Sequence, residues 1–290
     1  MHTKDAKGIL SPQNGMNNYR GCSHGCIYCD SRSKCYSMDH AFEDIEIKGN
    51  AAELLEDALR RKRKKCMIAT GSMSDPYIHL EEKIHSTRRC LELIEKYGFG
   101  LAIQTKSDRI LRDLDLLCKI NANAKCVVQM TLTTYDEELC KILEPYVSTT
   151  KRRFEVLKIM QEHHIPTVVW LDPLLPFIND TEENLRGILN YCHEAGVYGI
   201  IFFGIGLTLR EGNREYFYAK LDEHFPGLKE KYQKKYGDAY QVMSDHNEAL
   251  SKIFRDECKR MNIVSDVNQI FEYLHTYEPE PKVKQMELFD

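Results

Sequence analysis

The stretch Asn18-Tyr-Arg-Gly-Cys-Ser-His-Gly-Cys-Ile-Tyr-Cys-Asp30 places three cysteines, Cys22, Cys26 and Cys29, within eight residues. Thiols spaced this closely are typical of metal ligands, because a group of three rarely fits into one hydrophobic core. A closed tetrahedral site needs four ligands, and this loop supplies three. Either a fourth ligand lies elsewhere in the chain, or the open position has a function of its own.

Zinc is one candidate for this group, with Cys35, His24 or His40 as the fourth ligand. Structural zinc sites usually combine two closely spaced pairs of ligands separated by a longer loop, whereas here there is one compact group. An iron–sulfur cube is the other candidate. Each of its four irons takes one outside ligand, so three thiolates leave one iron open to bind a substrate or cosubstrate.

Apolar runs alternate with helical patterns along the chain that follows. Five runs are predicted as buried strands, at residues 66–71, 100–105, 126–133, 166–171 and 198–203. A further strand at residues 15–20, before the cysteines, makes six, and each strand is followed by a predicted helix. This alternation predicts an α/β fold with a parallel sheet and right-handed crossovers, either open and doubly wound or closed as a barrel.

The chain changes character after the last predicted strand. Residues 209–261 are polar and helical in pattern, and the end of the chain contains Pro279 and Pro281. We therefore predict three parts: a barrel with the cysteine loop at residues 1–206, a helical C-terminal extension at 207–275 and a flexible tail at 276–290.

The overall composition is that of an ordinary globular protein. The chain has 290 residues, 42% of them hydrophobic, and a net charge of −4, which gives no support to a strongly nucleic-acid-binding domain. Neither a secretory signal nor an apolar run of membrane-spanning length is present. Eleven cysteines without such a signal favour reduced thiols in the cytoplasm.

The spacing of the cysteines, with Tyr28 just before the third, resembles the signature of the radical S-adenosylmethionine (SAM) enzymes. This resemblance implies a partial (β/α)6 barrel of the TIM-like type, which has fewer units than the complete (β/α)8 barrel. It also implies a [4Fe–4S] cluster on Cys22, Cys26 and Cys29. The open iron would chelate SAM. One electron, from a donor such as flavodoxin or ferredoxin, would then cleave SAM to a 5′-deoxyadenosyl radical that abstracts hydrogen from a substrate.

Further segments resemble the branch of this superfamily that is related to spore photoproduct lyase. They lie at residues 71–77, 105–113, 143–145 and 172–180, with Phe225-Pro-Gly227 fitting the same branch. The resemblance implies that Lys106 meets the carboxylate of SAM and that Ser74 contacts its amino group. Tyr28, Asp75 and Asp172 complete the predicted set of cofactor-binding residues.

The two aspartates also have simpler interpretations. Asp75 could cap a turn, and Asp172, directly after a predicted strand, could mark a loop entry or hold a ribose hydroxyl or the substrate. Parallel strands present such residues at the mouth of a barrel, where active sites are built. Lys151-Arg-Arg153 is a further candidate for phosphate contacts.

Two positions depart from the lyase pattern. Ser72 stands where the lyase has a cysteine that donates a hydrogen atom, and Asp30 stands where a tyrosine is usual. We therefore expect a relative with a different substrate, and radical chemistry on a nucleic acid or nucleotide is the leading hypothesis. Radical modification of a small molecule or protein, and a non-catalytic metal-stabilised binding module, are the alternatives.

The tail carries one more motif. Gln285-Met-Glu-Leu-Phe289 resembles the peptide by which bacterial repair and replication proteins bind the sliding clamp. Gln285, Leu288 and Phe289 would make that contact, and a flexible tail is suited to it. The alternative is that these residues dock on the barrel of the same chain.

Overall fold

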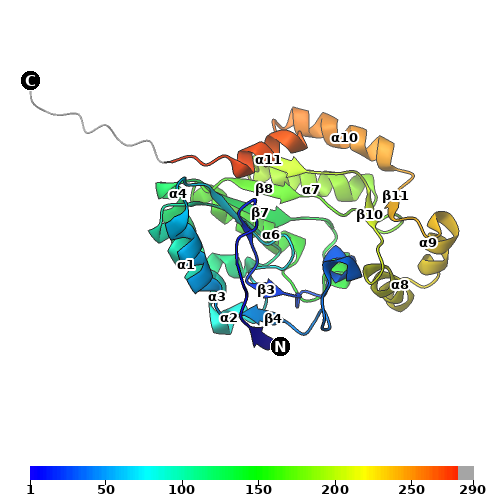
Figure 1. The fold of residues 1–290 in the computed structure, drawn as a ribbon. Helices are drawn as coiled ribbons and strands as arrows, with labels where there is room; N and C mark the ends of the chain where they lie inside the picture. The colour runs from blue at the N-terminus through cyan, green and yellow to red at the C-terminus, as the bar shows by residue number, and fades with distance from the viewer. Residues whose placement is uncertain (280–290) are drawn as a thin grey trace, which may run out of the picture.

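The centre of the protein is a six-stranded parallel sheet, seen in a computed structural model that describes residues 1–279 (Figure 1). Neighbouring strands in the sheet follow one another in the chain. Their bounds are β2 Gly15–Met16, β5 Met67–Thr70, β6 Gly100–Thr105, β7 Cys126–Thr131, β8 Thr167–Trp170 and β9 Gly199–Ile201. This is the predicted partial (β/α)6 barrel, with β2 and β9 at its two ends. The predicted clamp-binding peptide at 285–289 lies outside the described residues.

Helices connect the strands and cover one face of the sheet. They are α1 Ala51–Arg61, α2 Glu81–Ile84, α3 Ser86–Lys96, α4 Leu114–Asn123, α5 Glu137–Leu143, α6 Thr150–Glu162 and α7 Glu182–Glu194, with a short 3-10 helix at Asp108–Asp113. Each longer helix buries one stripe; in α3 these residues are Cys90, Leu91 and Ile94. Thr181 and Asp136 cap α7 and α5 by accepting backbone N–H groups.

The two faces of the sheet have different neighbours because successive residues of a strand point to opposite sides. Ile68, Leu101, Val128 and Val169 belong to the large core under the connecting helices. The alternate residues face α11, Val267–His275, which was not expected to cover the sheet. They pack with Ile270 and Leu274 of this helix and are Met67, Ala102, Val127, Val168 and Ile201. Helix α11 therefore fills the end of this face nearest the start of the strands.

A second, smaller sheet lies beside the N-terminus (Figure 1). It joins β1 His2–Lys4, β4 Glu46–Lys48 and β3 Tyr19–Arg20, with β4 in the middle. The predicted strand at 15–20 is thus divided: β2 joins the large sheet, and β3 turns away to pair with β4. Short 3-10 helices follow the cysteines at Asp30–Arg32 and Lys34–Tyr36.

The C-terminal part is helical but also contains a pair of strands that the sequence did not predict. Strands β10, Gly206–Thr208, and β11, Gln241–Met243, pair antiparallel, and α8 Asn213–His224 and α9 Leu228–Tyr236 connect them. These elements lie together at the right of Figure 1. Helix α10, Asn247–Arg260, returns along the molecule and packs on α7. No helix among residues 1–279 is long and apolar enough to span a membrane.

Candidate active site

A cavity of about 420 Å³ opens at the carboxyl ends of the parallel strands. Residues at the ends of β6 to β9 line it, on the same face that α11 covers further down: Gln104, Lys106, Thr131, Trp170, Asp172 and Phe203. The opposite wall comes from the cysteine loop, residues 21–30, and from the β10–β11 pair: Tyr28, Cys29, Asp30, Thr208, Gln241 and Met243. The sequence prediction that these motifs share one end of the barrel is therefore confirmed.

The cysteine loop is curved by two glycines in left-handed backbone conformations. Gly21 has φ +86° and Gly25 φ +71°, and a Cβ at Gly21 would lie 2.3 Å from the carbonyl oxygen of Phe42. Two backbone hydrogen bonds join the loop to the last residue of α5 and to the segment that follows it. Ile27 donates to Leu143 at 3.0 Å, and Tyr146 donates to the His24 carbonyl at 3.1 Å. Residues 143–146 thus hold the loop in place, and 143–145 are among the residues that resemble the lyase branch.

The three predicted cluster ligands come together on this loop. Cys22, Cys26 and Cys29 are free thiols and line a smaller cavity of about 110 Å³, which adjoins the larger one. His24 lines it too; its side chain is 2% exposed and its Nε2 has no hydrogen-bond partner among the described residues. Three thiols that line one small cavity, beside a buried histidine with an unpartnered ring nitrogen, fit a bound inorganic group better than a packed core.

Lys106 lies at the junction of the two cavities and lines both. Burial alone would lower the pKa of its ammonium group, but the Cys26 thiol and the Glu144 carboxylate raise the pKa above its ordinary value. The ammonium group also lies 5.8 Å from the centre of the Tyr28 ring. Lys106 is thus a charged group at the position predicted for a carboxylate contact.

Ser74 and Asp75 line the smaller cavity, and the side chains of both also make hydrogen bonds to other residues of the chain. The Ser74 hydroxyl donates to the Gly21 carbonyl at 2.6 Å, which joins the end of β5 to the cysteine loop. Asp75 accepts from the Tyr77 backbone at 2.8 Å, the Thr105 hydroxyl at 2.7 Å and the Lys106 backbone at 2.8 Å.

This set of contacts gives Asp75 a structural role. Its second carboxylate oxygen also lies 3.5 Å from Nδ1 of His24. Burial lowers the pKa of His24 to about 4, so the imidazole is neutral at pH 7. Asp75 thereby fixes the ends of β5 and β6 relative to the loop, in agreement with the turn interpretation.

Asp172 stands apart, because its carboxylate lines the larger cavity and is largely withdrawn from water. Burial raises its pKa to about 6, and the charge of Lys106 opposes that rise. A largely buried carboxylate that lines a cavity can accept hydrogen bonds from the hydroxyl or amino groups of a bound molecule.

The sequence did not reveal a buried ion pair behind the loop. Arg153, predicted as a candidate for phosphate contacts, is fully buried and pairs with Glu144. It also donates to the carbonyls of Lys106 and Thr131, each at 3.0 Å, and the Tyr28 hydroxyl donates to Glu144. The phosphate prediction fails for Arg153, because every side of its guanidinium group is engaged. The Arg153–Glu144 pair acts on the site by holding Lys106, through the bond from Arg153, and Tyr28, through the bond to Glu144.

Asp30, one of the departures from the lyase pattern, connects the cysteine loop to the C-terminal part. Its carboxylate accepts from the Tyr36 hydroxyl at 2.7 Å and from Thr208 at 3.3 Å, and it pairs with Arg210 at 3.3 Å. In the sequence, only the position of Asp30 directly after Cys29 indicated a role for this residue, and nothing indicated its contacts with Thr208 and Arg210. The β10–β11 pair is therefore attached to the loop through this side chain.

Comparison with known proteins agrees with these features. The family model described as the radical SAM superfamily matches residues 16–192, which is more than half of the chain. The chain therefore belongs to the radical SAM superfamily. This family uses SAM together with an iron–sulfur cluster.

The similar proteins include uncharacterized proteins of distant organisms. A protein of Mycobacterium bovis is 29% identical over 227 residues, which are 76% of this chain and 66% of that protein. A protein of Methanocaldococcus jannaschii is 32% identical over 169 residues, which are 58% of this chain and 62% of that protein. The chain thus spans slightly less than two thirds of the length of these relatives.

Solved structures show the same fold. A mutant of spore photoproduct lyase has a TM-score of 0.64 at 14% identity, covering 89% of this chain and 78% of that one. The lyase complexed with dinucleoside spore photoproduct has a TM-score of 0.63 at 15% identity, with the same coverage. These likenesses confirm the partial barrel, and at such low identity they show the fold alone.

Proposed function

We propose that Cys22, Cys26 and Cys29 bind a [4Fe–4S] cluster with one iron left for SAM. The observation that carries this proposal is the convergence of three free thiols and the Lys106 ammonium group on one small cavity. Three cysteine ligands for four irons leave one coordination position. When bound there, SAM and the reduced cluster supply a 5′-deoxyadenosyl radical.

The surrounding residues have separate roles in this proposal. Lys106 pairs with the carboxylate of SAM, and Ser74, although its proton is engaged, offers hydroxyl lone pairs to its amino group. Tyr28 closes the wall between the two cavities, and Asp172 accepts from hydroxyl groups in the larger one. Asp75 acts indirectly, by holding Lys106 and the cysteine loop.

For the substrate we favour a nucleic acid or nucleotide. Trp170 and Phe203 line the larger cavity, with ring centres 6.3 Å apart, and Phe203 is 55% exposed. Exposed aromatic rings beside a cavity are suited to stacking with bases. One solved structure of similar fold contains a dinucleoside photoproduct. Ser72 lines the same pocket and has a hydroxyl in place of a thiol, so in this proposal a product radical takes its hydrogen from a group other than the side chain at position 72.

The first test is the formation of 5′-deoxyadenosine. Protein reconstituted anaerobically with iron and sulfide is reduced with dithionite, or with flavodoxin or ferredoxin as the proposed cytoplasmic donor, in the presence of SAM. We expect 5′-deoxyadenosine from the wild type and none from Cys29→Ala. Cys66→Ala changes a partly exposed cysteine away from the loop and serves as the matched control. Activity of Cys29→Ala equal to that of the control refutes the cluster assignment.

A second test addresses the substrate. Ultraviolet-irradiated oligonucleotides, undamaged oligonucleotides and free nucleotides are added to the same reaction. We expect at least one of them to increase 5′-deoxyadenosine formation and to be altered in mass. If none does while the reaction without substrate proceeds, the nucleic-acid proposal is wrong and a small molecule or peptide takes its place.

A further inference from the structure

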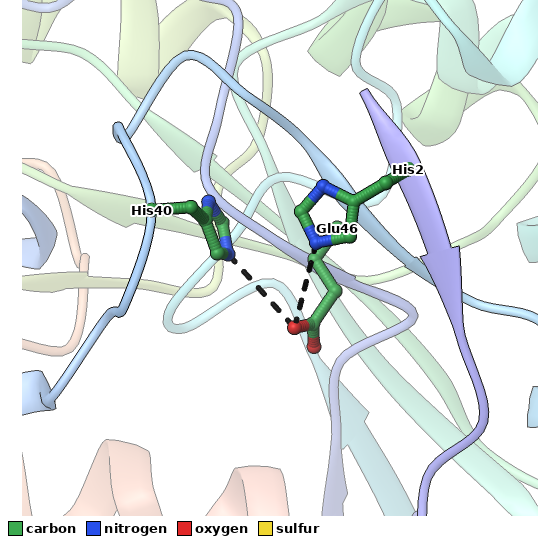
Figure 2. A group of neighbouring side chains, drawn as sticks. All are labelled: His2, His40 and Glu46. Atoms are coloured by element: carbon green, nitrogen blue, oxygen red, sulfur yellow. Dashed lines mark ion pairs between the residues drawn. The ribbon is translucent and has the colours of Figure 1, made fainter.

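The small N-terminal sheet gathers three potential metal ligands that have no part in the site above. His2 belongs to β1, Glu46 to β4, and His40 to the loop that leads into β4. Their ligand atoms all lie within 4.8 Å of one another. Figure 2 shows the two imidazole rings pointing toward the same oxygen of Glu46.

The distances are close to those of a metal site. The Nε2 atoms of His2 and His40 each lie 3.9 Å from the same carboxylate oxygen of Glu46. Two ligand atoms that are each ~2.1 Å from a tetrahedral zinc ion are about 3.4 Å apart. A contraction of roughly 0.5 Å in each of these two histidine–carboxylate distances would bring both to the separation that a shared ion requires.

Both imidazoles are held in the tautomer that metal binding requires. Nδ1 of His2 lies 3.1 Å from the Asp44 carboxylate, and Nδ1 of His40 lies 3.0 Å from the carbonyl of Ala41. Both partners can only accept, so each Nδ1 carries a proton, and the neutral form of each ring has its lone pair on Nε2. Histidine ligands of metals usually have such an acceptor behind them.

The atoms that face one another are also unsatisfied. Nε2 of His40 and the facing oxygen of Glu46 are buried and have no hydrogen-bond partner among the described residues. Buried polar atoms without partners are costly, and a bound ion or water is one way in which a protein satisfies them. The Lys4 ammonium group lies 3.6 Å from the same oxygen, but its side chain is 56% exposed and can swing toward Asp39.

We propose that His2, His40 and Glu46 form a binding site for a divalent transition-metal ion, with zinc as the best match. Two imidazoles and one carboxylate are a common zinc ligand set, and water would complete the tetrahedron. The site is independent of the proposed reaction.

The location of this site gives the ion a structural role. His2 and Arg20 are the residues that pair with Glu46 in the register of the small sheet, one on each side. Cys22 follows Arg20 by two residues. An ion on these ligands would fasten the N-terminal strand and the loop at His40 to the sheet from which the cysteine loop begins.

The test measures zinc in reconstituted protein that carries no histidine tag. We expect one zinc per chain, in addition to iron and sulfide, and a higher melting temperature when zinc is supplied. His40→Ala and Glu46→Gln should lose the zinc and the thermal shift but keep the iron. His193→Ala, which removes an exposed histidine of α7, is the matched control and should keep both.

Variants separate this site from zinc misplaced on the cysteines. Zinc that persists in His40→Ala but disappears in Cys29→Ala overturns the proposal, as does the absence of stoichiometric zinc from the wild type. Asp44→Asn weakens the support behind His2 and should reduce zinc affinity about 10- to 100-fold. Lys4→Gln removes a competing cation and should bind zinc at least as tightly as the wild type, whereas weaker binding would contradict the assignment.

Discussion

Replacing Asp172 by asparagine should stabilise the folded protein while impairing its activity. Asp172 lines the larger cavity, and burial raises the pKa of its carboxyl group from the ordinary 3.8 to about 6. The ionised carboxylate of Asp172 therefore lowers the free energy of unfolding, because it is solvated less well in the folded state than in the unfolded chain. Asparagine has nearly the same shape and no charge, so it removes this effect.

The size of the effect follows from the shift of the pKa. Each unit corresponds to about 1.4 kcal/mol, so a shift of about two units costs the wild type about 2 to 3 kcal/mol at pH 7. The sign is set by proton binding. Between the unfolded and the folded pKa the folded state binds more protons, so the stability of the wild type falls as pH rises through this interval. Above the folded pKa the cost is complete and constant.

Urea denaturation of the cluster-free protein at several pH values measures this difference. We expect Asp172→Asn to be more stable than the wild type at pH 7 and above, and the two to converge as the pH falls toward 4. Asp256→Asn, on the exposed side of α10, is the matched control and should follow the wild type at every pH. The slope of free energy against urea should be unchanged.

Activity supplies the second half of the test. If Asp172 accepts hydroxyl groups of SAM or of the substrate, Asp172→Asn should raise KM or lower 5′-deoxyadenosine formation despite its greater stability. A variant that is both less stable than the wild type and fully active would refute the reasoning, because it would show that the carboxylate serves the fold and not the site.

Two further substitutions test the supports behind the site. Glu144→Gln leaves the charge of Arg153 buried without its partner and should lower the free energy of unfolding by about 3 to 5 kcal/mol; a loss below about 1 kcal/mol would contradict the pair. Burial alone would raise the pKa of Glu144, but the charges of Arg153 and Lys106 and the hydrogen bonds from Arg153 and Tyr28 together lower it. The contribution of the pair to stability is therefore present at neutral pH and fades as the solution is acidified. Gly71→Ala, at φ +102° and with the new Cβ 2.0 Å from the Gln104 carbonyl, should cost more than about 2 kcal/mol in urea denaturation, while Gly8→Ala should cost less than about 0.5 kcal/mol.

The strands of the barrel could be predicted because their residues are buried on both sides. Gly100–Thr105 forms β6 as predicted, and the other apolar runs are each a few residues longer than the strands they form. The first strand was harder to predict, because residues 15–20 form two short strands in different sheets. Only Gly15–Met16 belongs to the barrel sheet, and Tyr19–Arg20 belongs to the small sheet. A short edge strand that changes partner leaves no periodic pattern in the sequence.

The position of the site was predictable from motifs, but the buried Glu144–Arg153 ion pair behind the cysteine loop was not. The cysteines and Lys106 are recognised by spacing and by their place after strands. Glu144 and Arg153 are nine residues apart and meet only because α5 and α6 fold back on each other. A charged residue at the start of a helix is usually solvated, and nothing local in the sequence shows that Arg153 is buried.

The alternation of side chains along the strands explains why the cavity lies where it does. On the face opposite the connecting helices, the early positions of β6, β7 and β8 are apolar and covered by α11, as Ala102, Val127 and Val168 show. The same face continues, two and four residues later in the chain, into polar and aromatic residues that line the cavity: Gln104, Lys106, Thr131, Trp170 and Asp172. Trp170 lies at the boundary, because its ring also packs against Phe271 of α11. One helix thus closes the sheet to the point where its residues become polar. The cysteine loop and the β10–β11 pair enclose the space that remains, so the position of the cavity follows from where α11 ends.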